Sequence, residues 1–264
     1  MRFARAYAAV FLSLVVIIPV ISQQNASPSV SATTLLSQSL AAQTGNAQIS
    51  DVTLTGTARR IAGSDDESGT VTYRALANGA SRYDFSYTSG PRTEVRATLS
   101  TGFLGAWSGP DGVSHPLAPH NVANRSDIFP AFTLAPAIST ANLVTTLLGL
   151  ETKNGQSAYH ISVSQQFPQI KPNAAALAQH LTQTEIFLDA STLLPVAIDF
   201  NTHPDDNSSL DIPVELIFSD YRAVSGSHIP FHIQKFLNGG LVLDLQFQTA
   251  ALNTGLSPTL FSAQ

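Results

Sequence analysis

Histidine is the residue type that most directly suggests a metal site here, because it occurs seven times and ligates transition metals. His228 and His232 share one face of a predicted strand, but at ~3.3 Å per residue they lie about 13 Å apart. Two ligands so far apart cannot bind one ion at about 2 Å each. His115 and His120 bracket a proline-rich loop, and His203 precedes two aspartates, but none of these spacings is typical of zinc sites. We therefore expect no metal ion and no other cofactor.

Nucleophilic catalysis would need a serine or cysteine beside a base. The chain contains no cysteine, and no serine stands in the G-x-S-x-G pattern of a strand–turn–helix elbow. Ser227, His228 and Asp220 could assemble as a Ser–His–Asp set in space, but many other triples could do so too. Carboxylates cluster only in predicted loops, where runs of charge are usually solvated. They are Asp65, Asp66, Glu67, Asp205 and Asp206. These patterns predict that the protein is not an enzyme.

Aromatic side chains recur on consecutive predicted strands and indicate a third kind of chemistry, the burial of apolar groups. They form either an ordinary core beneath helices or the wall of an incompletely filled cavity that holds an acyl chain. The low charge of the chain, 12% of its residues, is compatible with both interpretations. The residues that we expect to line such a cavity are Tyr83, Phe85, Tyr87, Trp107, Val196, Ile198, Phe200, Leu216 and Phe218.

Antiparallel strands are expected to position these side chains, because polar and apolar residues alternate with a period of two in both halves of the chain. Asn78 with Gly79, and Asn238 with two glycines after it, mark tight hairpins. The pattern predicts roughly ten strands. They are residues 51–61, 70–76, 81–88, 92–99, 102–107, 157–167, 183–189, 193–201, 212–224, 228–237 and 241–251.

Three helices interrupt the strands in this prediction. Residues 31–43 have a serine that can cap a helix and a glycine stop after them. Residues 138–150 place leucines at i, i+4 and i+7, and residues 173–181 form another short helix. Residues 114–137 contain four prolines and are expected to be an irregular crossing, while 63–69 is expected to be a solvated turn. Helices inserted between two runs of strands indicate an α+β fold with an antiparallel sheet.

The first 22 residues have the layout of a secretory leader. Arg2 and Arg5 precede the apolar stretch 10–21, and compact residues precede a cut after Ser22. The apolar stretch is too short for a membrane span. We therefore expect a periplasmic or secreted protein. Its predicted parts are a signal peptide (1–22), a disordered tether with an N-terminal helix (23–50) and one folded domain (51–264).

Charge and cysteine content narrow the classes of partner. The chain carries 13 Lys and Arg against 18 Asp and Glu, and without the two leader arginines 11 basic residues face 18 acidic ones. An acidic surface argues against binding nucleic acid or anionic membranes, since both need basic patches. The absence of cysteine excludes disulfides and lipid attached to cysteine. We expect stability to come from buried apolar area, with no stable membrane insertion.

Two stretches in the second half show a specific order of strands and turns. Residues 184–200 read T-E-I-F-L-D-A-S-T-L-L-P-V-A-I-D-F, a strand, an aspartate turn, Leu-Pro and a returning strand. Residues 218–234 read F-S-D-Y-R-A-V-S-G-S-H-I-P-F-H-I-Q, and the last strand ends in L-N-T-G-L-S-P-T-L-F. Earlier in the chain stand R-Y-D-F at 82–85 and G-A-W-S-G-P-D-G at 105–112. In these pieces the chain resembles the LolA-like superfamily of periplasmic lipoprotein carriers and sorting proteins. Members of that superfamily have a strand with an arginine beside aromatic residues, and a turn before the next strand, at the positions of the last two pieces.

That resemblance implies an open, strongly curved antiparallel half-barrel. Helices would cover its concave face, and an apolar cleft between helices and sheet would receive acyl chains. In the carrier, an arginine inside the barrel helps to hold the closed form. Several arginines of this chain could correspond to it, and the sequence assigns the role to none of them. They are Arg59, Arg74, Arg82, Arg92 and Arg96. The predicted fold class is thus α+β, a half-barrel of roughly ten strands.

The sequence favours non-covalent binding of a hydrophobic ligand, a lipid or the acyl chains of a lipoprotein, driven by apolar burial at ~25 cal/mol per Å². Two other classes stay open. A structural or sensory module would have a filled core and would use the same sheet to dock an envelope protein. A hydrolase would show ester turnover that is lost in the Ser227→Ala variant.

Overall fold

The computed structural model describes residues 30–100, 102–124 and 126–262. The predicted signal peptide (1–22) and residues 23–29 of the tether lie outside the described residues. The described residues form one 13-stranded sheet in the order β6-β5-β4-β3-β2-β1-β13-β12-β11-β10-β9-β8-β7. Every neighbouring pair in it is antiparallel.

The described residues form 13 strands, four α-helices and one 3₁₀ turn. The strands are β1 (Asp51–Ala62), β2 (Asp65–Leu76), β3 (Ser81–Tyr87), β4 (Gly90–Leu99), β5 (Gly102–Ser108), β6 (Ser114–Pro116), β7 (Leu143–Lys153), β8 (Gln156–Gln165), β9 (Thr184–Asp189), β10 (Pro195–Thr202), β11 (Ile212–Val224), β12 (Ser227–Leu237) and β13 (Gly240–Leu252). The helices are α1 (Ala32–Thr44), α2 (Pro119–Val122), α3 (Pro130–Ser139), α4 (Pro172–Leu181) and the 3₁₀ turn η1 (Pro258–Phe261). Within the described residues, none of the helices has the length and apolar content needed to cross a membrane.

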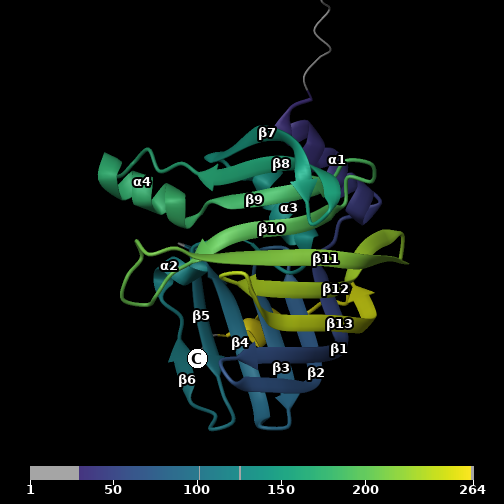
Figure 1. Ribbon diagram of the computed structural model, residues 1–264, viewed down its shortest axis with the longest axis vertical. Coiled ribbons are helices and arrows are strands. Elements are labelled where there is room, and N and C mark those ends of the chain that lie inside the picture. Colours follow the sequence, from purple (N-terminus) through teal and green to yellow (C-terminus); the bar gives the residue numbers. More distant parts are fainter. Residues whose placement is uncertain (1–29, 101, 125, 263–264) are drawn as a thin grey trace, which may run out of the picture.

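The sheet consists of two meanders, β1–β6 and β7–β13, which are joined where the first strand pairs with the last. Its edge strands are β6 and β7, so the sheet stays open. In Figure 1, β7–β13 run across the view while β3–β5 run along its long axis, so the sheet turns strongly between its two ends. The expected antiparallel α+β fold is confirmed, although the sheet has three more strands than the roughly ten expected.

A bulge accommodates the bend where the two meanders join. The pairing of β1 with β13 shifts register between Thr55 and Gly56. A Cβ added to Gly56 would lie 2.1 Å from the carbonyl oxygen of Gln246, so only glycine allows the two backbones to approach this closely. Bulges increase local twist and bend the strand that carries them. This glycine therefore helps to curve the sheet at its centre.

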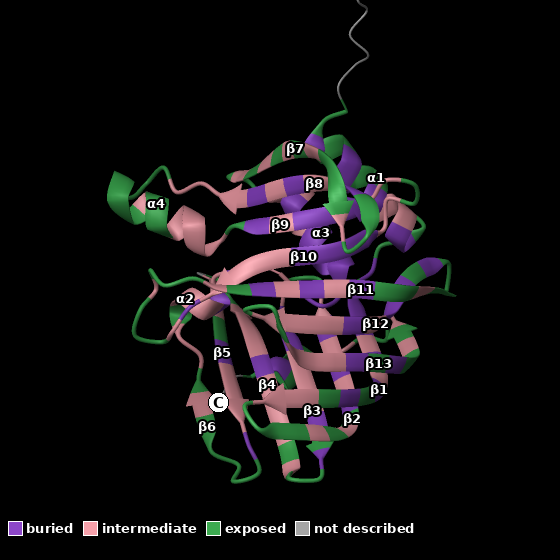
Figure 2. Cartoon of the chain, viewed as in Figure 1, coloured by how far each residue is buried: buried purple, intermediate pink, exposed green. Residues whose placement is uncertain are grey.

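Helices α1 and α3 cover the inner face of the sheet. Their side chains Leu36, Phe129 and Leu134 are fully buried and belong to the same core as residues of β1–β3 and β8–β13. Helix α1 begins as predicted, with the hydroxyl of Ser31 accepting the N–H of Thr34, and ends at a left-handed glycine. Figure 2 shows the buried residues concentrated along α1, α3 and the middle strands.

The predicted helix at residues 138–150 is wrong. The helix in this region, α3, ends at Ser139, and the leucines belong to strand β7. Leu147 packs against the core, while Leu148 and Leu150 are exposed. Burial alternates from residue 143 to residue 150, but leucines stand on both faces of this edge strand, so their spacing imitates a helix. Its β-branched run at residues 144–146 favours the strand.

Two loops predicted from the sequence also carry regular structure. Most of the predicted turn at 63–69 is the start of β2, where Asp66 and Glu67 pair across the hairpin with Arg59 and Arg60 of β1. The proline-rich crossing contains β6, α2 and the start of α3. Cross-strand pairing of opposite charges accounts for acidic residues in a strand.

Helix α4 contributes little to covering the sheet. It has no buried residue, and Figure 2 shows it standing out from the strands. The predicted helix at 173–181 is confirmed. Among the described residues, the concave face is covered by α1, α3 and the segment between β6 and α3. This partial cover leaves room beside the sheet.

Candidate functional site

A cavity of about 390 Å³ lies between strands near one end of the curved sheet and strands of its middle. One wall comes from β3, β4 and β5, and the other from β10, β11, β12 and β13. Residues 117–124 and 126–128, which we call the crossing segment, close it between these walls. Because residues far apart in sequence form it, the cavity depends on the curvature of the sheet.

Stacked aromatic rings line the wall at β3. The rings of Tyr83 and Phe85 are stacked with centroids 5.6 Å apart, and Phe85 stacks in turn on Tyr87 at 5.3 Å. Aromatic pairs at such separations contribute beyond their buried area and hold each other's orientation. Trp107 of β5 lies beside this wall, with the guanidinium of Arg92 4.3 Å from its ring centroid. Three of these aromatic rings, those of Tyr83, Phe85 and Trp107, line the cavity.

Five of the nine side chains predicted to bind a ligand line this cavity. They are Tyr83, Phe85, Trp107, Phe200 and Leu216.

The other four belong to clusters of packed side chains. Tyr87, Ile198 and Phe218 lie in the main core, and Val196 packs in a separate cluster with Ala158, Phe187 and Ala197. The pairing of β10 is irregular between Pro195 and Ala197, which breaks the alternation on which the prediction for Val196 depended.

Charged groups also line the cavity, although the sequence suggested apolar walls. They are Arg92, Glu94, Arg96, Asp127 and Lys235. Asp127 is buried, and its Oδ1 accepts hydrogen bonds from the hydroxyl of Tyr73 and, at 2.8 Å, from the N–H of Phe129. Burial raises the pKa of Asp127 despite these bonds, and burial next to this carboxyl raises the pKa of Tyr83 well above its usual value.

Arg96 connects β4 to the crossing segment. Its Nη2 donates to the carbonyl of Val122 at 2.7 Å and its Nη1 to the carbonyl of Ser126 at 3.3 Å. The guanidinium also lies 4.3 Å from the ring centroid of Phe103. Hydrogen bonds that involve a charged donor are the stronger kind. Of the five arginines considered from the sequence, Arg96 is thus the one that holds the cover of the cavity.

Asn124 attaches the same segment to the start of β9, the strand next to the opposite wall. Its buried amide donates to the carbonyl of Gln183 at 2.9 Å and to the hydroxyl of Thr184 at 3.0 Å, which places it against the start of β9. The crossing segment is therefore tied to strands β4 and β9. The sequence indicated only an irregular crossing here, because neither contact leaves a local pattern.

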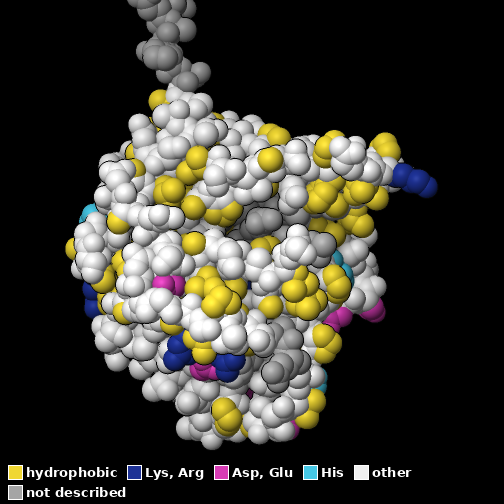
Figure 3. Space-filling view, turned by 180° about the vertical axis from the view of Figure 1, so that it is seen from behind, with side chains coloured by type: hydrophobic (Ala, Val, Ile, Leu, Met, Phe, Trp, Pro, Cys, Tyr) yellow, Lys and Arg dark blue, Asp and Glu magenta, His cyan; other side chains and the backbone are white. Residues whose placement is uncertain are grey.

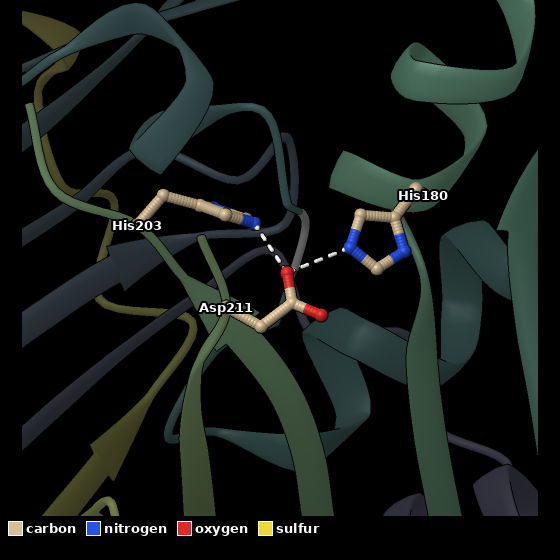
Figure 4. A group of neighbouring side chains, drawn as sticks. All are labelled: His180, His203 and Asp211. Carbon is tan, nitrogen blue, oxygen red and sulfur yellow. Dashed lines mark hydrogen bonds and ion pairs between the residues drawn. The ribbon is translucent and has the colours of Figure 1, made fainter. Parts of the chain in front are cut away.

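A second group of polar side chains lies beside the cavity, at the end of α4. Nε2 of His180 lies 2.8 Å, and Nε2 of His203 3.1 Å, from the same Oδ1 of Asp211 (Figure 4). The side chain of His203 is completely buried, and burial lowers its pKa. Hydrogen bonding to His180 and His203 lowers the pKa of Asp211. The sequence carries no local signal for this group, because His180 and Asp211 are 31 positions apart and lie on different elements.

The triple considered for hydrolysis does not assemble. The buried hydroxyl of Ser227 donates to the carbonyl of Thr44, and Nδ1 of His228 lies 2.9 Å from the carbonyl of Ala42. Asp220 pairs with Arg222 at 2.5 Å. Since Ser227 is buried and His228 exposed, their side chains point away from each other on β12.

The molecular surface has little charge on the face opposite to that of Figure 1. Figure 3 shows hydrophobic side chains there in separate groups, with basic and acidic side chains confined to small areas. Such a face has no extended basic stripe of the kind that nucleic acids need.

Comparison with solved structures identifies the architecture. A LolA superfamily protein from Nitrosomonas europaea superposes with a TM-score of 0.54 at 13% identity, over 89% of this chain and 98% of that chain. A putative outer membrane lipoprotein-sorting protein domain from Vibrio parahaemolyticus gives 0.53 at 11% identity, over 87% and 95%. A DUF1329 family protein from Desulfovibrio piger gives 0.56 at 10% identity, over 88% and 95%.

Comparison of the sequence with family models and curated proteins finds no relative: no protein-family model matches the chain, and no curated protein matches its sequence. The three superpositions nevertheless cover nearly the whole folded part of this chain. The chain has a LolA-like fold, as its strand and turn motifs indicated.

Proposed function

We propose that this chain is an exported envelope protein that binds one amphipathic, lipid-like molecule in the cavity under the crossing segment. The apolar part of the ligand lies against the aromatic wall, and its anionic end lies near Lys235. The single observation that supports this proposal over a module with a filled core is the unfilled cavity itself.

The size of the cavity supports a small ligand. Its volume of 390 Å³ lies within the range of about 300–1,000 Å³ that is usual for small-molecule sites. A single acyl chain or a small amphiphile suits such a volume better than a group of several acyl chains.

The charges in the wall support an anionic ligand end. Three basic residues, Arg92, Arg96 and Lys235, line the cavity together with the acidic Glu94 and Asp127. Because its pKa is raised, Asp127 carries less negative charge than an ordinary carboxylate near its titration range. A carboxylate or phosphate group is therefore favoured over a cationic one.

The fold and the predicted leader support a place in the bacterial envelope. The Vibrio parahaemolyticus neighbour is named as a lipoprotein-sorting domain of the outer membrane, and the Nitrosomonas europaea neighbour belongs to the LolA superfamily. The first 22 residues have the pattern of a cleaved signal peptide. A lipid with one acyl chain, or one acyl chain of a lipoprotein, is therefore the candidate ligand, and an envelope protein the candidate partner.

A binding assay with delipidated protein tests the proposal. A fluorescent fatty acid is titrated into the protein, with its emission excited directly, and saturable binding of one molecule per chain is expected. Leu243→Trp places a larger side chain beside the cavity and should weaken binding at least tenfold. Leu148→Trp, on the exposed face of β7, should leave binding unchanged.

The head group is tested by a second comparison. Lys235→Gln should weaken binding of the fatty acid more than binding of the matching fatty alcohol. The control is Lys171→Gln, at an exposed position directly before α4, which should affect the binding of neither. Absence of saturable binding would favour the protein-docking module, and equal binding by the Leu243→Trp variant would place the ligand elsewhere.

A further inference from the structure

We propose that His180, His203 and Asp211 form a binding site for one divalent transition metal ion, with Zn²⁺ the best chemical match. Each offers one ligand atom, and the three atoms all lie within 4.8 Å of one another (Figure 4). Imidazole nitrogen and carboxylate oxygen are common zinc ligands, and three protein ligands with a water complete a tetrahedral site. This proposal does not depend on the lipid-like ligand.

The separations are close to those of a loaded site. Two ligands about 2.1 Å from a tetrahedral ion lie about 3.4 Å apart. The two contacts between histidine and aspartate measure 2.8 and 3.1 Å, so each needs to widen by a few tenths of an ångström. The two imidazole nitrogens lie within 4.8 Å of each other and have to reach the same separation of about 3.4 Å. The side chains of His180 and Asp211 are about two-fifths exposed and can make this adjustment. The ion can enter from their side.

The placement of His203 presents one ring nitrogen to the carboxylate. Its side chain is fully buried. When Nε2 binds an ion, the proton of the neutral imidazole stands on Nδ1, which has no hydrogen-bond partner among the described residues, so the coordination bond has to outweigh that cost. What the placement achieves is to aim Nε2 at the same carboxylate oxygen that His180 contacts.

The backbone beside His203 is held firmly. The side chain of Asn121 accepts the N–H of His203 at 2.8 Å and donates to its carbonyl at 2.8 Å. This double contact fixes the position from which the imidazole projects. Asn121 also lines the cavity, so the proposed metal site is a direct neighbour of the crossing segment.

A metal ion here would attach α4 to the rest of the molecule. Helix α4 buries none of its residues, and His180 lies in its last turn. His203 follows β10 and Asp211 precedes β11, so the ion would join α4 to the connection between these strands. Coordination bonds would replace two hydrogen bonds and restrain α4 beside the cavity.

Calorimetric titration of the chelator-treated chain with Zn²⁺ tests the site. Binding of one ion per chain is expected, together with an X-ray absorption spectrum that shows two imidazole nitrogens and at least one oxygen ligand. His180→Ala should weaken binding more than tenfold, since loss of an outer-shell partner alone costs 10–100-fold. His228→Ala, an exposed histidine on β12, should bind like the wild type.

Asp211→Asn separates metal binding from hydrogen bonding. The amide oxygen of asparagine still accepts hydrogen bonds from the imidazoles, but a neutral amide is a poor zinc ligand. The variant should stay folded by circular dichroism and lose Zn²⁺ affinity at least tenfold. No saturable Zn²⁺ binding by the wild type, or unchanged binding in both the His180 and Asp211 variants, would overturn the proposal and leave a hydrogen-bonded cluster.

Discussion

The guanidinium of Arg96 donates to the carbonyl of Val122 at 2.7 Å and so ties strand β4 to the segment that closes the cavity. A second hydrogen bond, to the carbonyl of Ser126, adds to this attachment. Since Asn124 binds the start of β9, this short segment bridges strands β4 and β9, which are far apart in the strand order. The attachment by Arg96 is polar and half-buried, so it can be broken without unfolding the core.

Arg96→Leu should loosen the crossing segment. The variant loses two charged hydrogen bonds, each worth about 1.5–3 kcal/mol, and leaves carbonyl groups in need of other partners. We expect faster amide hydrogen exchange in residues 117–124 and faster exchange of a bound fatty acid. Arg82→Leu, which loses contacts to Asp84 and Leu260, is the control and should leave this segment unchanged. Equal exchange in both variants would contradict the role of Arg96.

Asp127→Asn should change how stability depends on pH. Burial raises the pKa of Asp127 above its unfolded value of about 3.9, so the folded state binds more protons between the two values. The free energy of unfolding then falls as pH rises through that window. Asparagine stays neutral and still accepts from Tyr73 and Phe129, so the variant should gain Tm relative to wild type as pH rises from 4 to 8. Asp206→Asn, an exposed residue, should show no such trend.

Asp51→Ala should weaken the junction between β1 and the C-terminal segment. The carboxylate accepts hydrogen bonds from the N–H groups of Thr254 and Gly255 and from the hydroxyls of Thr254 and Ser50. Although burial acts to raise the pKa of Asp51, these bonds lower it below its ordinary value. We expect a loss of about 3 kcal/mol at pH 7, which is a fall in Tm of roughly 6–12 °C.

The same pKa shift fixes the direction of the pH effect at Asp51. A lowered pKa gives stability that is present above about pH 3.9 and is lost as pH falls through the folded pKa. The difference in Tm between wild type and Asp51→Ala should therefore shrink in acid. Asp65→Ala, an exposed position at the start of β2, serves as control. A difference that grows in acid would contradict this account.

Leu36→Ala should detach part of the helical cover. The side chain is fully buried between α1 and the sheet, and such truncations cost about 2–5 kcal/mol through lost burial and the cavity left behind. Leu148→Ala, at a position 56% exposed on β7, should change stability by less than about 0.5 kcal/mol. Chemical unfolding of both variants measures the difference, and similar midpoints would contradict the packing of α1.

Local patterns were sufficient to predict most elements of the fold. Alternation located the strands, and turn residues located several hairpins, because both depend on residues close in sequence. The turn after β9 is an example: the sequence indicated an aspartate turn, and the carboxylate of Asp189 accepts the N–H groups of Ser191 and Thr192 there. Leucines near residue 147 misled the same reasoning, since leucines on both faces of an edge strand can imitate helical spacing.

The sequence by itself determined an antiparallel, β-rich chain with a leader pattern, little charge and no cysteine, because composition and short-range periodicity encode these properties. Only the tertiary structure decided which side chains face the cavity, and it placed five of the nine expected residues there. Only the folded chain brings Arg96 to the crossing segment, or His180 to Asp211 across 31 positions. Such contacts depend on how far the sheet curves and where it bulges, and the sum of many small packing terms sets that curvature.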